Sequence, residues 1–187
     1  MVTSTATGHQ PLHAPSYYAH SAHKSTERPT LQDSTRADVC IVGAGYTGLS
    51  TGIALAEAGL KVVVLEQARV GWGASGRNGG QIVHSFSRDI DVIERNYGQA
   101  MAEPLARMMF EGAQVIRERV AKYKIDCDLK DGGIFAAISP RKAKGLEEQK
   151  QLWEKWGHPG LTLVDTPAEV SKYVNTERYT ALLIDPT

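Results

Sequence analysis

Three glycines follow an apolar run at Val39–Val42 with the spacing Gly-x-Gly-x-x-Gly: Gly43, Gly45 and Gly48. Between a strand and a helix, the first allows a tight turn, the second lets the backbone approach a pyrophosphate, and the third lets helix and strand pack closely. The N–H groups and dipole of the helix N-terminus attract the phosphates. Glu66, 18 residues after Gly48, can accept both ribose hydroxyls of an adenosine. These residues predict a dinucleotide site, at which the Glu66 charge disfavours NADP.

A second glycine-rich stretch, residues 71–82, has the sequence GWGASGRNGGQI. It leaves the carboxyl end of a predicted strand, where ligands lie in open α/β sheets. It combines glycines with polar side chains: Gly76, Arg77, Asn78, Gly79, Gly80 and Gln81. The glycines would let main chain lie against a flat ring, the two amides would bond the ring edge, and the arginine would stabilise negative charge on a reduced flavin or pair with a phosphate. Spacing alone leaves open an exposed turn with an incidental arginine.

One βαβ unit is predicted to position both glycine stretches. Its strands are the apolar, β-branched runs Asp38–Val42 and Lys61–Leu65, both expected to be buried. The Ala-rich stretch Leu49–Ala58 predicts the intervening helix, which Gly59 ends. The strands should be parallel with a right-handed crossover. Cys40, in the middle of the first strand, should pack as a small hydrophobe.

Apolar spacing predicts further elements after the glycine loop. They are helices at Pro104–Tyr123 and Pro140–Trp156, a hairpin at Cys127–Ile138, strands at Leu161–Val164 and Thr180–Asp185, and a short helix capped by Asp165 or Thr166 with Pro167 in its first turn. His84, just beyond the loop, is a candidate base, but a surface or packing role at a strand edge is favoured.

Composition and charge restrict the class of protein. Hydrophobic residues make up 42% of the 187 residues, and Lys plus Arg equal Asp plus Glu at 21 each. An ordinary globular protein is expected, without a field that favours nucleic acid or an anionic membrane. The apolar runs are too short to span a bilayer. Cys40 and Cys127 lie far apart and outside any CxxC motif, which argues against a disulfide framework or zinc site and favours a reducing cytoplasm.

The first 36 residues form a Ser-, Thr-, His- and Pro-rich arm without a secretory signal. Four of the six histidines lie in it, and their irregular spacing argues against a metal site: His9, His13, His20 and His23. We predict three segments, namely this arm (1–36), the N-terminal part of a nucleotide-binding domain (37–100), and a helical region that begins a substrate domain (101–187). Only two strands of a doubly wound sheet are visible, so the chain is expected to be the front portion of a longer protein.

The motifs resemble those of a known family. The stretch DVCIVGAGYTGLSTGIALAEAGLKVVVLE followed by VGWGASGRNGGQI is similar to the FAD-dependent amine and D-amino-acid oxidases. The runs SFSRDIDVIERNYG, MMFEGAQVIRERVAKYKIDCDLKDGGIFAAI and LEEQKQLWEKWG resemble the bacterial group that oxidises gamma-glutamylputrescine. The similarity covers about residues 16 to 185 and implies an α/β fold with a Rossmann-like FAD-binding βαβ unit, then helices and the start of an α+β substrate domain.

The resemblance also implies an activity. An enzyme of this kind oxidises a primary amine, here gamma-glutamylputrescine, to an aldehyde with release of ammonia, and molecular oxygen is reduced to hydrogen peroxide. The implied FAD contacts are Gly43, Gly45, Gly48, Glu66, Ser75, Arg77, Asn78, Gly79 and Gly80. No catalytic residue is assigned, because most of the substrate domain is absent. For the same reason, the isolated chain is expected to be inactive and to bind FAD weakly or not at all.

Two alternatives remain open from the residues. One is an NAD-linked dehydrogenase, since NAD and FAD share the ADP half, although the SGRNGGQ loop speaks against it. The other is a nucleotide-binding or partner-binding remnant that is not an enzyme.

Overall fold

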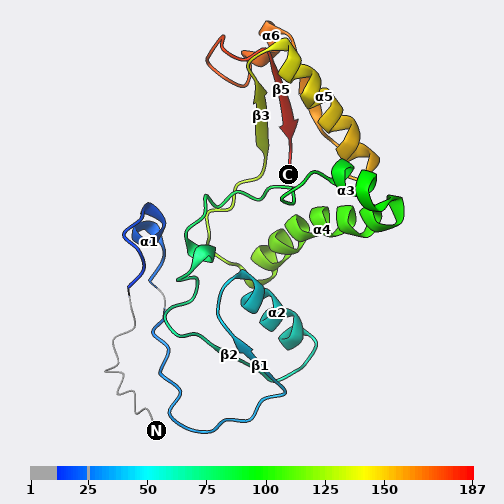
Figure 1. Ribbon diagram of the computed structural model, residues 1–187. Coiled ribbons are helices and arrows are strands. Elements are labelled where there is room, and N and C mark those ends of the chain that lie inside the picture. The colour runs from blue at the N-terminus through cyan, green and yellow to red at the C-terminus, as the bar shows by residue number, and fades with distance from the viewer. Residues whose placement is uncertain (1–11, 25) are drawn as a thin grey trace. The chain divides into compact units, whose positions relative to one another are not determined.

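The computed structural model describes residues 12–24 and 26–187 (Figure 1). The chain divides into two compact units, Met1–Gln81 and Ile82–Thr187. Part of the predicted N-terminal arm, including His9, lies outside the described residues. The rest of the arm contains a short helix, α1 (Tyr17–Ser21), whose first turn is capped by the Ser16 side chain. The division into an arm, a nucleotide-binding part and a substrate part stays a prediction.

The first unit is built around the predicted βαβ arrangement. Strand β1 (Val39–Val42) pairs in parallel with β2 (Val62–Leu65), and α2 (Tyr46–Glu57) connects them (Figure 1). Helix α2 lies close to the strands at Gly52, where a Cβ atom would come within 3.3 Å of the Val64 side chain. The parallel pairing and the end of α2 before Gly59, which has φ +86°, confirm the predictions.

Two expectations for this unit are wrong. Helix α2 begins at Tyr46 rather than Leu49, because Gly45 is its N-cap residue and the Ser75 Oγ accepts from the Tyr46 N–H. Strand β1 is not buried on both faces, although α2 and β2 pack against it. Its alternate residues are exposed, with Val42 at 87%, and Cys40 is an exposed thiol rather than a packed hydrophobe.

The second unit combines helices with an antiparallel sheet. The sheet has the order β3-β5-β4, and helix α5 packs against it (Figure 1). The elements are α3 (Ile90–Tyr97), α4 (Gln99–Tyr123), β3 (Gly133–Ala137), α5 (Pro140–Lys155), β4 (Thr162–Val164), α6 (Pro167–Val170) and β5 (Ala181–Asp185). Ser139 caps α5 by accepting from the Lys142 N–H, and Thr166 is the N-cap residue of α6, as predicted. None of the helices in the described part of the chain is both long and apolar enough to cross a membrane.

The core of this unit lies between α5 and the sheet. Trp153 packs with Leu161 and Leu183, and the last of these is fully buried in the central strand. Trp153 is therefore an anchor of this core. A second cluster joins α3 to α4 through Ile90, Ala102 and Ala106, where the small alanine side chains let the two helices approach.

Two predictions for the second unit are wrong. Cys127–Ile138 is not a hairpin, because Gly133–Ala137 pairs with the distant strand Ala181–Asp185. Helix α4 begins at Gln99, since Gly98, with φ +80°, separates it from α3, and Pro104 lies inside the helix. Met108 and Ile116 of this helix are exposed, whereas its buried residues are alanines.

Candidate dinucleotide-binding site

The turn between β1 and α2 brings main chain from three segments together. Gly43, with φ +101°, donates its N–H to the Leu65 carbonyl at 2.7 Å. The Ala44 carbonyl accepts from the Gly71 N–H at 2.9 Å, which joins this turn to the glycine loop. A Cβ atom on Gly48 would lie 1.9 Å from the Gly43 carbonyl oxygen. Only glycine therefore permits this close approach of α2 to the turn.

Glu66 lies beside the turn as an ionised hydrogen-bond acceptor. Its Oε2 accepts from the Ala44 N–H at 2.8 Å, and its Oε1 accepts from the Ala68 N–H at 2.9 Å. The Ala44 N–H and then the Ala68 N–H lower the pKa of Glu66 from its ordinary value of 4.5, because both bonds favour the charged carboxylate. A carboxylate has about four lone-pair positions, so Glu66 retains capacity to accept ribose hydroxyls.

The glycine loop reaches the N-terminus of α2 through Ser75. This residue lies in a short 3-10 turn, η1 (Ala74–Gly76), and its Oγ accepts from the Tyr46 N–H at 3.0 Å. A Cβ atom on Gly45 would come within 2.8 Å of the same Oγ. Both glycine stretches thus meet at the end of α2 that can hold phosphate.

Asn78 is bonded within the loop. Its Nδ2 donates to the Tyr46 hydroxyl and to the Ser75 carbonyl, both at 2.9 Å, and its Oδ1 accepts from the Gly80 N–H at 2.9 Å. Gly80 itself has φ +73°, a backbone conformation that residues with a side chain rarely adopt. The asparagine therefore holds the loop in shape, a role that sequence reasoning missed.

Arg77 lies against an aromatic ring. Its Nε donates to the Trp72 carbonyl at 3.1 Å, and its guanidinium carbon is 4.9 Å from the centroid of the Trp72 ring. The Trp72 Nε1 donates in turn to the Leu12 carbonyl at 2.9 Å. Gly79 is tightly placed only against the flexible Gln81 side chain, whose Oε1 would be 2.3 Å from an added Cβ. The Arg77 guanidinium is thus positioned by the Trp72 ring, a partner that the spacing of the loop residues did not indicate.

All nine residues predicted for the cofactor site lie in the first unit. The structure brings Gly43, Gly45, Gly48, Glu66 and Ser75 to one turn. The contributions of the Ala44 and Tyr46 backbone were missed, because main-chain groups give no residue-type signal.

His84, the candidate base, lies in the second unit outside any strand. It is 4% exposed and packs against Phe110 and Trp153, with ring centroids 5.3 and 5.7 Å away. A packing histidine is confirmed, whereas the surface and strand-edge alternatives are wrong, because the segment before α3 is covered by α4 and α5 side chains.

Curated relatives share much of this sequence. The chain is 54% identical over 173 residues to gamma-glutamylputrescine oxidoreductase of Escherichia coli, which is 92% of this chain and 40% of that protein. It is 38% identical to the probable oxidoreductase OrdL of Haemophilus influenzae, over 92% of this chain and 40% of that protein. The chain thus spans about two fifths of the length of these relatives.

Solved structures share the fold. An L-amino acid deaminase from Proteus vulgaris superposes with a TM-score of 0.63 at 21% identity, over 94% of this chain and 43% of that one. L-proline dehydrogenase from P. horikoshii superposes with a TM-score of 0.61 at 22% identity, over 79% of this chain and 36% of that one. The predicted α/β fold is confirmed. Residues 38–187 match the family described as DAO, FAD dependent oxidoreductase. The chain therefore belongs to the DAO family of FAD-dependent oxidoreductases, whose cofactor is FAD.

Proposed function

We propose that this chain supplies the ADP-binding part of a flavin-dependent amine oxidase that acts on gamma-glutamylputrescine. The 54% identity to a protein of that name supports the substrate. FAD, when bound, takes a hydride equivalent from the amine-bearing carbon and passes the electrons to oxygen, so that hydrogen peroxide forms and the imine hydrolyses to an aldehyde and ammonia.

The donor and acceptor groups at the βαβ turn fit the ADP half of FAD. Helix α2 begins directly after Gly45, so its N-terminal end would attract the pyrophosphate, and the absence of a side chain on Gly45 leaves room there for the Ser75 hydroxyl. The ionised Glu66 would accept the ribose hydroxyls and repel a 2′-phosphate. The observation that carries the proposal is the close approach of α2 to the turn at Gly48, where an added Cβ atom would clash with the Gly43 carbonyl.

The glycine loop would complete the cofactor site. Ser75 already accepts from an α2 N–H, as a phosphate oxygen would, and it lies within reach of the same end of the helix. Arg77 would provide a fixed positive charge, and Gly79 and Gly80 would let main chain approach the flavin ring. Asn78 would act indirectly, by keeping the loop in its bonded form.

Nucleotide titrations test the binding half of this proposal. Calorimetry at high concentrations of the chain should show weak binding of ADP at the βαβ turn, with NADP binding at least about tenfold weaker still because its 2′-phosphate meets Glu66. Glu66→Gln should weaken the binding of ADP and narrow the difference between the affinities for ADP and NADP. Equal binding of ADP and NADP would show that Glu66 does not contact the ribose.

A chimera tests the catalytic half. This chain would replace the matching stretch of the E. coli relative, and the purified chimera would be assayed with gamma-glutamylputrescine. We expect retained flavin absorbance and equal amounts of hydrogen peroxide and ammonia. A folded chimera without flavin, or one that reduces added NAD instead of oxygen, would contradict the proposal.

We also propose that the protein works in the cytoplasm. Cys40 and Cys127 are both exposed free thiols, which persist in a reducing compartment. Fractionation of cells that express the tagged chain would test this, with a periplasmic location as the contrary result.

A further inference from the structure

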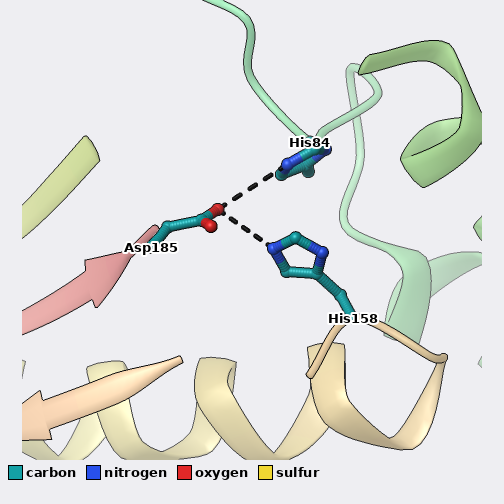
Figure 2. A group of neighbouring side chains, drawn as sticks. All are labelled: His84, His158 and Asp185. Carbon is teal, nitrogen blue, oxygen red and sulfur yellow. Dashed lines mark hydrogen bonds and ion pairs between the residues drawn. The ribbon is translucent and has the colours of Figure 1, made fainter. Parts of the chain in front are cut away.

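A cluster of three buried polar side chains lies in the second unit, and we call it the His84–His158–Asp185 cluster (Figure 2). His84 precedes α3, His158 follows α5, and Asp185 ends β5. They are 4%, 8% and 4% exposed. The Asp185 Oδ2 lies 3.1 Å from His158 Nε2 and 3.6 Å from His84 Nε2, so one carboxylate oxygen faces both rings.

His84 is the member of the cluster whose ring nitrogens lack hydrogen-bond partners. Neither its Nδ1 nor its Nε2 has a hydrogen-bond partner among the described residues, and both atoms are shielded from solvent. The 3.6 Å separation from Asp185 is too long for a hydrogen bond. A buried imidazole without partners is costly, because its polar atoms have lost water and gained nothing. The site therefore lacks a group that would bind a ring nitrogen.

Asp185 is oriented by atoms outside the cluster. Its Oδ1 accepts from the Thr187 N–H at 3.0 Å and from the Thr187 hydroxyl at 2.8 Å, which leaves Oδ2 directed at the histidines. Burial raises the pKa of Asp185, but the Thr187 and His158 hydrogen bonds outweigh this and keep it below the ordinary value. Burial, and then the nearby His158, lowers the pKa of His84, although Asp185 opposes this. The cluster thus directs one carboxylate oxygen and two imidazole rings at one place, and both kinds of group are ligands of metal ions.

Aromatic side chains hold both rings in place. Phe110 stacks on His158 with the centroids 4.7 Å apart and the planes at 2°, and Trp153 meets the edge of His84 at 5.7 Å. A groove of about 1130 Å³ in the same unit is lined by both histidines, Phe110 and Arg117. The two histidines therefore pack against aromatic rings and also line the groove.

We propose that His84, His158 and Asp185 bind a zinc ion through two imidazole nitrogens and one carboxylate oxygen. One potential ligand atom from each residue lies within 4.8 Å of the others, which is compatible with bonds of about 2.0–2.2 Å to a shared ion after a small adjustment. Three protein ligands leave a fourth tetrahedral position, which water or a small anion would take. The predicted absence of a metal site rested on spacing in the arm and on the cysteines. These ligands come from three distant segments instead.

The test uses the whole chain in a background that removes other zinc ligands. The four arm histidines are replaced by glutamine and both cysteines by serine, so that His84 and His158 are the only histidines left. After treatment with a chelator, calorimetry should show one Zn²⁺ per chain, and Co²⁺ should give the visible absorption bands of a four-coordinate site. A folded background chain, checked by circular dichroism, that binds no Zn²⁺ would overturn the proposal and leave a proton-sharing cluster.

Variants in this background locate the ion. His158→Gln and Asp185→Asn should each weaken Zn²⁺ binding at least about tenfold, and Thr187→Val, which leaves all three ligands in place, should weaken it by about tenfold by freeing the carboxylate. Asp165→Asn, at an exposed acid of the same unit, should leave binding unchanged. Unaltered affinity in His158→Gln and in Thr187→Val would refute this ligand set, even if Asp185→Asn fails to fold.

Discussion

The Ser75 hydroxyl oxygen accepts a hydrogen bond from the Tyr46 N–H at 3.0 Å, across 29 positions of sequence. Tyr46 is the first residue of α2, so this N–H belongs to the group that a helix cannot satisfy by itself. The preceding residue, Gly45, has no side chain to serve as a cap. The glycine loop therefore caps the helix that is proposed to hold the pyrophosphate, and loop and helix stabilise each other.

Replacing Ser75 by alanine should destabilise the first unit. The variant leaves the Tyr46 N–H without its acceptor, a loss that typically costs about 0.5–2 kcal/mol for capping side chains. Urea unfolding followed by the fluorescence of Trp72 would measure it, in chains where Trp153 and Trp156 are replaced by phenylalanine. Ser34→Ala, at an exposed serine of the arm, is the control and should have no effect. Equal stability of both variants would mean that water replaces Ser75 at no cost.

Gly48→Ala should be among the most damaging small changes in the first unit. The added methyl group would lie 1.9 Å from the Gly43 oxygen and 3.1 Å from its carbonyl carbon, so backbone must move. Overpacking of this kind costs about 1–3 kcal/mol. Gly73→Ala is the matched control, because its Cβ would meet nothing within 4 Å. The same unfolding assay should separate the two, and similar losses would show that α2 can shift away from the turn.

The sequence predicted the parts that depend on local signals. The spacing of Gly43 and Gly48, the acid at the end of β2 and the parallel pairing all follow from one continuous stretch. Helix α5 was also predictable, because Pro140 and a repeating apolar face define it.

The wrong predictions concern contacts between distant segments. Gly133–Ala137 looked like half of a hairpin, but its partner is Ala181–Asp185, and no local pattern selects one strand over the other. The exposure of Cys40 depends on which elements cover β1, which its own apolar residues do not reveal. The closeness of His84 and Asp185 could not be predicted either, because almost the whole second unit separates them in the sequence.

Asn78 should control the shape of the glycine loop through two separable bonds. Asn78→Asp keeps an oxygen that accepts from the Gly80 N–H but loses the donor to the Ser75 carbonyl. Asn78→Ala loses both of these bonds and the bond to the Tyr46 hydroxyl. Each lost bond should cost about 1 kcal/mol of local stability. Amide hydrogen exchange at Gly80 should therefore accelerate in Asn78→Ala and stay close to that of the unaltered chain in Asn78→Asp. Equal acceleration in both would show that the side chain acts as one unit.

Glu66 should make the first unit sensitive to acid. Its folded-state pKa lies below 4.5, because the Ala44 and Ala68 N–H groups bond the carboxylate. The carboxylate is ionised in both states above that value, so its stabilising contribution is complete there and is lost as the pH falls through the lower, folded-state value. In Glu66→Gln, the amide binds no proton in this range and cannot accept with both of its polar atoms. The variant should be less stable than the unaltered chain at neutral pH, and the difference should shrink on acidification.

Urea unfolding of both chains between neutral pH and about pH 3 would measure this difference in the free energy of unfolding. Glu27→Gln, at an exposed glutamate of the arm, is the control for a general change in charge and should follow the unaltered chain throughout. A gap between the unaltered chain and Glu66→Gln that stays constant down to the acid limit would show that amide shape, rather than the ionised carboxylate, accounts for the loss. A gap that closes would tie the stability of the βαβ turn to the same negative charge that is proposed to bind the ribose.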